Sequence, residues 1–346
     1  MIPSGERARI LAAVRACHAR IVRDVRAHLA PLVARGDWER AMAARGEGVG
    51  DLVYEIDAAA ERSVERLARD LGRIAPTRLL CEGIGEVVTG RGEPRLRVLV
   101  DPVDGTRNRM ADLRSAFALT GIAVERGGEP LTTSDIEIAV QTEIPPSDRT
   151  HAIQLVASRG EGCRRAALPL SRLGAPSRGV PLRAPRRVDV RSGYYSFLRY
   201  LPHERAAIAE IEVAFFERAR RIGVDPRRVY DDQWLCAAGQ LALVASGRMR
   251  MFADLRAHLA ARAGAKTIAS HPYDVCTALV ATEAGAVVLG GDFETLAAPL
   301  DLTTDVSVIA FPNEAARRAL EPVLRETLTA HEANAVARLR ADSARA

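Results

Sequence analysis

Apolar residues recur at the spacing of an α-helix in two stretches near the start of the chain, residues 5–33 and 54–71. Every third or fourth residue is apolar there, so one face of each predicted helix is hydrophobic and suited to pack against a core. Residues 36–51, which lie between them, are rich in glycine and predict a loop. The apolar positions of the two helices are Ile10, Val14, Cys17, Ile21, Val25 and Leu29, then Ile56, Ala60, Val64 and Leu67.

Short apolar runs bounded by turn residues follow, and they predict a series of β-strands. In the first half of the chain they cover residues 78–83, 96–102, 115–128, 135–145 and 151–162, and we expect Pro102 to end the second of these strands. Residues 168–187 are rich in proline, glycine and arginine and predict a linker. This places a boundary near residue 180, between an N-terminal part (1–180) and a C-terminal part (181–346).

Beyond that boundary, predicted strands and helices alternate, which is typical of an α/β part. The predicted strands are residues 188–195, 227–230, 248–255, 286–291 and 306–311. The predicted helices are residues 202–220, 232–247, 275–285 and 312–343.

The composition is that of a folded globular protein, because 48% of the residues are hydrophobic and 27% are charged. No apolar run approaches the roughly 18 residues of a transmembrane helix, so no membrane association is expected. Arginines interrupt the N-terminal apolar positions, which excludes a signal peptide. The five cysteines form no CxxC pair. This disfavours a zinc ribbon or a thioredoxin-type site and indicates reduced thiols in the cytoplasm.

The formal net charge of +5 is mildly basic, and all but one of the 49 basic residues are arginine, the exception being Lys266. Codon usage in a GC-rich genome would produce this bias, and so would a use of arginine's planar fork to bind phosphate. A nucleic-acid partner is disfavoured, because only 4% of the residues are aromatic and no basic stripe with interleaved aromatics is present.

The string DPVDGT, residues 101–106, offers the clearest candidate chemistry. It brings Asp101 and Asp104 together at the end of a buried strand, where two carboxylates repel each other unless a cation neutralises them. Oxygen ligands of this kind suit Mg²⁺. Gly105 permits a close backbone approach, and the amides of Gly105 and Thr106 would point outward as a small anion cradle. A metal beside an amide cradle can bind phosphate, although an Asp-Gly turn without any ligand has the same sequence.

Three further acidic residues stand at the ends of predicted elements. Asp57 lies near the start of the second helix, Glu82 ends the strand 78–83, and Asp274 precedes the apolar helix 275–285. Taken singly, Asp57 and Asp274 could be helix caps and Glu82 an ordinary loop charge. If the fold brings them to the two aspartates of DPVDGT, the five would form a two-metal site for phosphoryl transfer.

These strings resemble the signatures of the inositol monophosphatase family, within the lithium-sensitive, magnesium-dependent phosphatase superfamily that includes the fructose-1,6-bisphosphatases. DPVDGTRN (101–108) is similar to the family's D-P-[ILV]-D-G-T-x-N, and YDVCTALVATEAGA (273–286) to its W-D-x-A-A, apolar helix and E-A-G-G. DLVYEID (51–57), CEG (81–83), ASRGEGCR (157–164) and LVASG (243–247) match further strings in the same order, over about residues 5–320. The resemblance implies a layered sandwich of alternating helices and sheets, with an α+β N-terminal part, an α/β C-terminal part and metals at their junction.

The resemblance also implies two or three Mg²⁺ ions per site. Glu82, Asp101 and the backbone carbonyl of Val103 match the ligands of a first ion. Asp101, Asp104 and Asp274 match the ligands of a second ion, so that Asp101 bridges the two.

Asp57 matches a residue that helps to hold a third, weaker ion or orients the water. Thr106 matches the threonine that orients the nucleophilic water, so Asp57, Glu82 and Thr106 are the candidate catalytic residues. The amides of Gly105 and Thr106 match groups that receive phosphate oxygens. Glu86 is a weaker rival to Glu82 for the metal, because its spacing from the aspartates fits the family less well.

The substrate-contacting positions depart from the family's pattern. Arg109 replaces the usual aromatic residue after the asparagine, and Arg107 lies two positions earlier. The family's G-[ST]-A-A reads LCAA at residues 235–238, and Asp254 only loosely matches the acid that binds a ring hydroxyl. His271, in SHPYD, is a further candidate contact.

The function implied is a metal-dependent phosphoric monoester hydrolase, in which a metal-activated water attacks the phosphomonoester of a small metabolite in line. The metabolite would be a sugar, cyclitol or nucleoside phosphate. One alternative is a bisphosphatase for fructose bisphosphate or adenosine bisphosphate, with Arg107 and Arg109 holding the second phosphate. Another is a non-catalytic relative that binds a phosphorylated ligand. The family resemblance further implies a homodimer.

Overall fold

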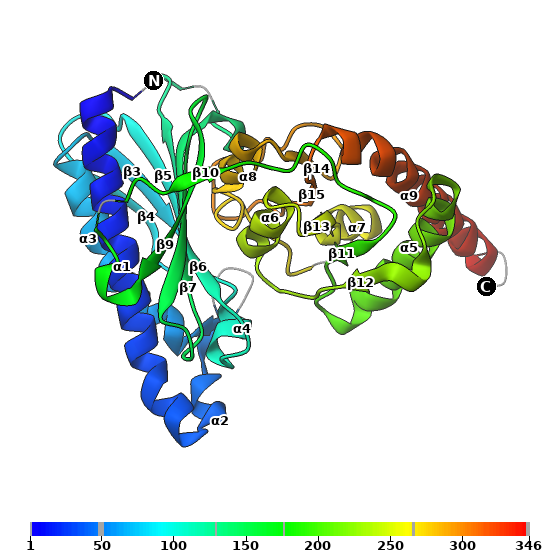
Figure 1. The fold of residues 1–346 in the computed structure, drawn as a ribbon, viewed down its shortest axis with the longest axis horizontal. Helices are drawn as coiled ribbons and strands as arrows, with labels where there is room; N and C mark the ends of the chain where they lie inside the picture. Colours follow the sequence, from blue (N-terminus) through cyan, green and yellow to red (C-terminus); the bar gives the residue numbers. More distant parts are fainter. Residues whose placement is uncertain (1, 48–51, 129, 176, 265–266, 344–346) are drawn as a thin grey trace.

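Two long helices cover one face of a β-sheet in the N-terminal part (Figure 1). They are α1 (Ser4–Arg35) and α3 (Glu55–Gly72), and the apolar positions predicted for each are buried. The structure is a computed structural model that describes residues 2–47, 52–128, 130–175, 177–264 and 267–343. Both predicted helices are therefore confirmed, and the reason is the hydrophobic stripe that each turns toward the sheet.

The sheet beneath these helices has eight strands in the order β10-β9-β8-β7-β6-β5-β3-β4. Every neighbouring pair is antiparallel except β3 and β5, which are parallel. The strands are β3 (Thr77–Cys81), β4 (Gly85–Thr89), β5 (Leu96–Asp104), β6 (Ala116–Val124), β7 (Ile136–Ile144), β8 (His151–Ser158), β9 (Gly162–Pro169) and β10 (Val180–Leu182).

A second sheet, of five strands in the order β12-β11-β13-β15-β14, forms the centre of the C-terminal part. Its strands β11, β12 and β13 are mutually parallel, whereas β15 is antiparallel to both β13 and β14. The strands are β11 (Gly193–Phe197), β12 (Val229–Asp231), β13 (Met249–Asp254), β14 (Val287–Gly290) and β15 (Val308–Phe311).

Helices α6 (Ala237–Ala245) and α8 (Ala278–Ala284) lie between the two sheets, and α5 (Pro202–Ala219) and α9 (Glu314–Ser343) cover the outer face of the second sheet (Figure 1). The layers thus alternate helix, sheet, helix, sheet, helix. Three clusters of buried apolar residues hold them together, one around each helix layer, and the middle cluster contacts both sheets. The predicted layered sandwich is confirmed.

Several short elements differ from the sequence predictions. The strand expected to end at Pro102 continues as β5 to Asp104, because the register with β6 shifts between Asp101 and Asp104 and accommodates the proline. The predicted linker 168–187 contains the end of β9 and the edge strand β10. Edge strands tolerate proline, since one row of their backbone groups pairs with no other strand.

Other predictions were displaced or incomplete. The strand expected at 188–195 lies at β11, and the helix expected at 232–247 is shortened to α6. Part of the loop expected at 36–51 forms helix α2 (Trp38–Ala41) and strand β1 (Ala44–Glu47). Strand β1 pairs with β2 (Leu52–Tyr54). Residues 48–51 of the expected loop lie outside the described residues. The pattern missed α4 (Thr106–Met110) and α7 (Arg256–Ala263). Among the described helices, none has both the length and the hydrophobicity that crossing a membrane requires.

Candidate active site

The end of strand β5 carries the first two acidic side chains of the site. Asp101 is 1% exposed and Asp104 is 6% exposed, so both carboxylates are buried. Gly105 follows in the left-handed region, with φ 96°, and turns the chain into α4. A Cβ atom at Gly105 would lie 3.0 Å from Cys236 Cβ, so both the backbone conformation and the space require glycine. The sequence Asp-Gly-Thr therefore fixes the sharp exit of this strand.

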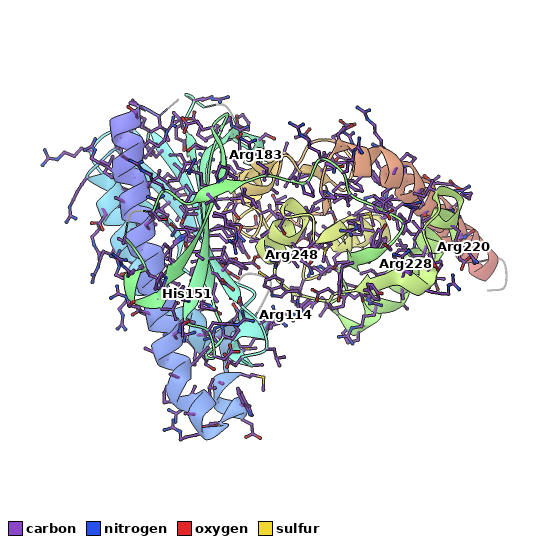
Figure 2. The ribbon with its side chains drawn as sticks, viewed as in Figure 1. Arg114, His151, Arg183, Arg220, Arg228 and Arg248 are labelled. Carbon is purple, nitrogen blue, oxygen red and sulfur yellow. The ribbon has the colours of Figure 1, made fainter. Side chains whose placement is uncertain are left out.

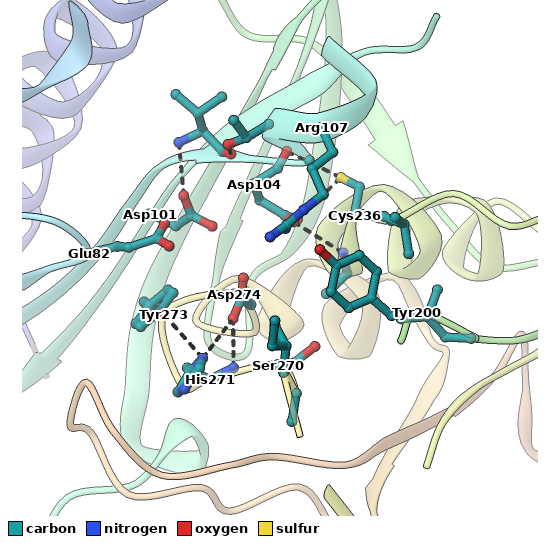
Figure 3. A pocket seen from close by; sticks show the side chains of 18 of the residues that line it. Glu82, Asp101, Asp104, Arg107, Tyr200, Cys236, Ser270, His271, Tyr273 and Asp274 are labelled. Carbon is teal, nitrogen blue, oxygen red and sulfur yellow. Dashed lines mark hydrogen bonds and ion pairs between the residues drawn. The ribbon is translucent and has the colours of Figure 1, made fainter. Parts of the chain in front are cut away.

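A third carboxylate arrives from the C-terminal part of the chain. Asp274 precedes α8, and its Oδ2 accepts a hydrogen bond of 2.6 Å from the backbone amide of His271. One oxygen from each of Asp101, Asp104 and Asp274 lies within 4.8 Å of the others. Residues separated by some 170 positions in the sequence are thus brought together at the junction of the two parts, as Figure 3 shows.

Burial and mutual repulsion disfavour the charged forms of these carboxylates. Burial raises the pKa of Asp101 well above its ordinary value, and the carboxylates of Glu82 and Asp104 raise it further. Burial and the charge of Asp274 raise the pKa of Asp104 to about 7. Burial also raises the pKa of Asp274. A bound cation would remove this repulsion, so the cluster is electrostatically suited to hold one.

The hydrogen bonding of Asp101 supports the same interpretation. Its Oδ1 accepts a 2.8 Å bond from the amide of Val103, whereas its Oδ2 is buried without a hydrogen-bond partner among the described residues. An unpartnered buried carboxylate oxygen costs about 1–3 kcal/mol or more, and a metal ion would supply the missing partner. Hard oxygen donors of this kind fit Mg²⁺.

Glu82, Asp57 and Thr106 lie in the same pocket as the three aspartates. Glu82 follows β3 directly and stands beside Asp101 in Figure 3. The Thr106 hydroxyl lies 3.0 Å from Asp57 Oδ1 and 2.7 Å from the carbonyl oxygen of Val103. It has one proton and donates to only one of them at a time. Its oxygen can accept a further hydrogen bond.

The rival glutamate, Glu86, is not in the pocket. It lies on β4, where its carboxylate pairs with Arg78 across the β3–β4 ladder. Its partner in the ladder is Leu80, and the ion pair with Arg78 holds its carboxylate further back along β3, away from Glu82 at the end of that strand. The structure therefore favours Glu82, as the spacing in the sequence did.

The start of helix α6 holds Asp104 in place. The amides of Ala237 and Ala238 donate to its two carboxylate oxygens at 3.2 and 2.8 Å. The Cys236 thiol lies 3.2 Å from Asp104 Oδ2, and its sulfur accepts a bond from the amide of Gly239. The sequence indicated only that Cys236, like the other four cysteines, is a reduced thiol. The match of LCAA to the family's G-[ST]-A-A was the available signal, since serine or threonine would also donate to this aspartate.

Of the four candidate substrate residues, Arg107 and His271 line the pocket. The Arg107 guanidinium lies over two aromatic rings, 4.6 Å from the centroid of Tyr200 and 5.6 Å from that of Tyr54. His271 stacks on Tyr273 with a ring separation of 5.1 Å. Neither Tyr200 nor the contact with Tyr54 was anticipated, because Tyr200 carries no motif.

Arg109 and Asp254 lie outside the pocket lining, which corrects the predicted substrate contacts. Arg109 is 1% exposed, and its guanidinium binds Asp112 at 2.7 Å. Asp254 is completely buried and forms a bidentate pair with Arg256, at 2.8 and 2.7 Å. Arg256, and not Asp254, is the member of this pair that lines the pocket.

Arg256 also fixes the segment that leads to Asp274. Its guanidinium donates to the carbonyl oxygen of Ile268, and the Ser270 hydroxyl donates to Asp254 at 2.9 Å. The pocket bounded by these groups has an empty volume of about 750 Å³, part of it open to solvent.

No protein-family model matches the sequence, and no curated protein matches it. Solved structures do match over most of the chain. A fructose-1,6-bisphosphatase of Leishmania major in holo form is 14% identical with a TM-score of 0.68, covering 94% of this chain and 96% of that one. The extragenic suppressor protein SuhB of Bartonella henselae is 20% identical with a TM-score of 0.59, covering 91% and 98%. The IMPase (inositol monophosphatase) of Thermotoga maritima is 18% identical with a TM-score of 0.57, covering 91% and 96%. The chain has the fold of these proteins, as the signature strings implied.

Proposed function

We propose that this protein is a Mg²⁺-dependent phosphatase that hydrolyses the phosphomonoester of a small metabolite, such as a sugar, cyclitol or nucleoside phosphate. The observation that supports this most is the cluster of Asp101, Asp104 and Asp274 with the buried, unpartnered Oδ2 of Asp101. A structural cluster of acids would satisfy that oxygen within the protein, whereas a metal site leaves it for the ion.

The same residues suggest how two or three ions would be held. Glu82, Asp101 and the carbonyl of Val103 would hold the first, and Asp101, Asp104 and Asp274 the second. When bound, Mg²⁺ lowers the pKa of a coordinated water and stabilises the charge that develops on the phosphoryl group and the leaving oxygen.

Asp57 and Thr106 have a positioning role in this proposal, and Asp57 would also contribute to a third ion. The Thr106 hydroxyl donates to Asp57 or to Val103 O, so its oxygen can accept a hydrogen bond from the attacking water and orient it. The amides of Gly105 and Thr106 would receive phosphate oxygens.

The test is phosphate release from a panel of sugar, cyclitol and nucleoside phosphates, together with Mg²⁺ binding by calorimetry. Wild-type protein should release phosphate from some member of the panel only with Mg²⁺ present. Asp104→Asn should abolish release and weaken Mg²⁺ binding, while Glu86→Gln, an acid of the same region outside the pocket, should change neither. Turnover that persists after removal of divalent metal would sink the proposal. Mg²⁺ binding without turnover on any substrate would favour a non-catalytic relative.

A bisphosphatase is the second candidate, and the position of Arg107 favours it. Its guanidinium lines the pocket and is held against Tyr200 and Tyr54, where it could bind a second phosphate of the substrate. Arg107→Ala should then raise KM for a bisphosphate and leave KM for a monophosphate unchanged. An equal rise for both would argue against this candidate.

A further inference from the structure

A second pocket lies on the α1 face of the first sheet and shares no lining residue with the candidate active site. Its walls are the first half of α1, strands β8 and β9, and residues 177–179, and its empty volume is about 610 Å³, part of it open to solvent. The charged side chains that line it are Arg7, Arg15, Arg164, Arg178 and Glu161. Four arginines against one glutamate give this pocket a strong positive charge.

The charge of Arg15 is not compensated within the described part of the chain. Its Nε is buried without a hydrogen-bond partner, and no ion pair with Arg15 forms among the described residues. Arg15 is half-buried, and this burial lowers its pKa. A guanidinium is expensive to desolvate without a partner, so an anion in the pocket would relieve this cost.

Arg7 is only partly compensated. Its side chain is 19% exposed and pairs with Glu161, which is 58% exposed. The Nε of Arg7 is nevertheless buried without a partner among the described residues. Two buried guanidinium nitrogens, from Arg7 and Arg15, therefore lack acceptors at this pocket, although a folded protein normally satisfies such donors.

The far wall of the pocket is held in a fixed conformation. Arg164 on β9 donates from Nε to the carbonyl of Arg178 and from Nη2 to the carbonyl of Gly179 at 3.1 Å. Gly179 has φ 54°, and a Cβ there would lie 2.7 Å from the carbonyl oxygen of Arg165. Glycine is thus required for the close approach of this segment to β9, and the pocket is formed before any ligand enters.

The remaining lining is mixed. Leu11, Val156 and Ala166 are apolar, while Gln154, Ser158 and Ser177 are polar. Such a lining suits a ligand with a small organic body and hydroxyl groups as well as an anionic group.

We propose that this pocket is a binding site for a small organic anion that carries phosphate or carboxylate groups, held chiefly by Arg15 and Arg7. Arginine's planar fork matches the oxygens of both groups. The site is separate from the proposed catalytic centre and does not depend on it.

The experiment measures binding and thermal stability with three probes: inorganic phosphate, glucose 6-phosphate and citrate. Binding is followed by calorimetry in the Asp104→Asn background, which prevents turnover, and in wild-type protein. Arg15→Gln should weaken binding of the preferred probe by about tenfold or more. Arg220→Gln is the control, because this exposed arginine lies in the C-terminal part, far from α1 (Figure 2). It should leave binding unchanged. Preference for the phosphates or for citrate identifies the anionic group.

Thermal unfolding gives a second, independent readout. Without probe, Arg15→Gln should melt at the same or a higher temperature than the parent protein, because a half-buried charge whose Nε has no acceptor among the described residues has been removed. With saturating probe, the parent should gain more in melting temperature than the variant. Binding that is insensitive to Arg15→Gln, or absent for all three probes, would overturn the proposal. Binding to wild type that disappears in Asp104→Asn would assign the anion to the active site instead.

Discussion

His18 offers the sharpest test of the packing between α1 and the first sheet. Its imidazole is completely buried, with Nδ1 2.9 Å from Thr142 Oγ1 and Nε2 2.9 Å from Thr120 Oγ1. Burial lowers the pKa of His18 from 6.5 to about 3. The neutral ring therefore bridges β6 and β7 from the helix, and protonation would place an unpaired charge in the core.

The pH dependence follows from this shift. The folded pKa lies below the unfolded one, so the unfolded chain binds the proton first as pH falls. The stabilising contribution is complete above pH 6.5 and is lost progressively as pH falls from 6.5 toward 3. At 1.36 kcal/mol per pKa unit, lowering the pH from about 7.5 to about 5 should reduce the free energy of unfolding by about 2 kcal/mol through this residue alone.

Urea unfolding followed by tryptophan fluorescence at the two pH values measures this loss. Other groups also titrate in this interval, and comparison of wild type with His18→Gln removes their contribution. The variant should lose about 2 kcal/mol less than wild type between the two pH values. His151→Gln, an exposed imidazole on β8 (Figure 2), is the control and should behave as wild type. Equal losses in wild type and His18→Gln would refute the reasoning.

Two further substitutions test the site and its surroundings. Gly105→Ala forces a side chain into the left-handed region and against Cys236, so it should reduce the free energy of unfolding by about 1–2 kcal/mol or more. It should also weaken Mg²⁺ binding at least tenfold, as measured by chemical denaturation and calorimetry; unchanged values would contradict the role of this turn. Arg109→Met breaks a buried pair with Asp112 and should cost about 3 kcal/mol of stability, with substrate KM unchanged. A rise in KM without loss of stability would restore Arg109 as a substrate contact.

The sequence anticipated the acidic cluster because most of its members belong to short, rigid strings. Asp101, Asp104 and Gly105 are separated by only a few bonds at the end of one strand, so local geometry places them together whatever the rest of the fold does. Asp274 comes from a different part of the chain, and no spacing rule relates it to Asp101. Its place was implied only by the resemblance, and the packing of α8 between the two sheets brings it to the others.

The pocket wall opposite the acids could not be anticipated, since its residues are set by tertiary contacts. Arg109 and Arg107 are two positions apart, yet α4 turns one toward Asp112 in the core and the other toward Tyr200. Two positions on a helix differ by about 200° around its axis, so neighbouring arginines in one motif cannot share a ligand. The sequence suggested that both arginines hold one phosphate. In the structure, Arg109 pairs with Asp112 in the core, and only Arg107 lines the pocket.

Asp254 is a second case in which a tertiary contact, and not the local sequence, decides the role of a residue. The acid expected to contact substrate is instead fully paired with Arg256, and a buried bidentate pair of this kind would lose much of its attraction if either partner turned to a ligand. Arg256, and not Asp254, lines the pocket, and its guanidinium donates to Asp254 and to the carbonyl oxygen of Ile268. An unpaired acid at this position would accept hydrogen bonds from hydroxyl groups, whereas Asp254 accepts them from Arg256 and Ser270. Under the proposed function, we therefore expect a substrate preference different from that of an inositol phosphatase, although Asp101, Asp104 and Asp274 come together as the family's motifs imply.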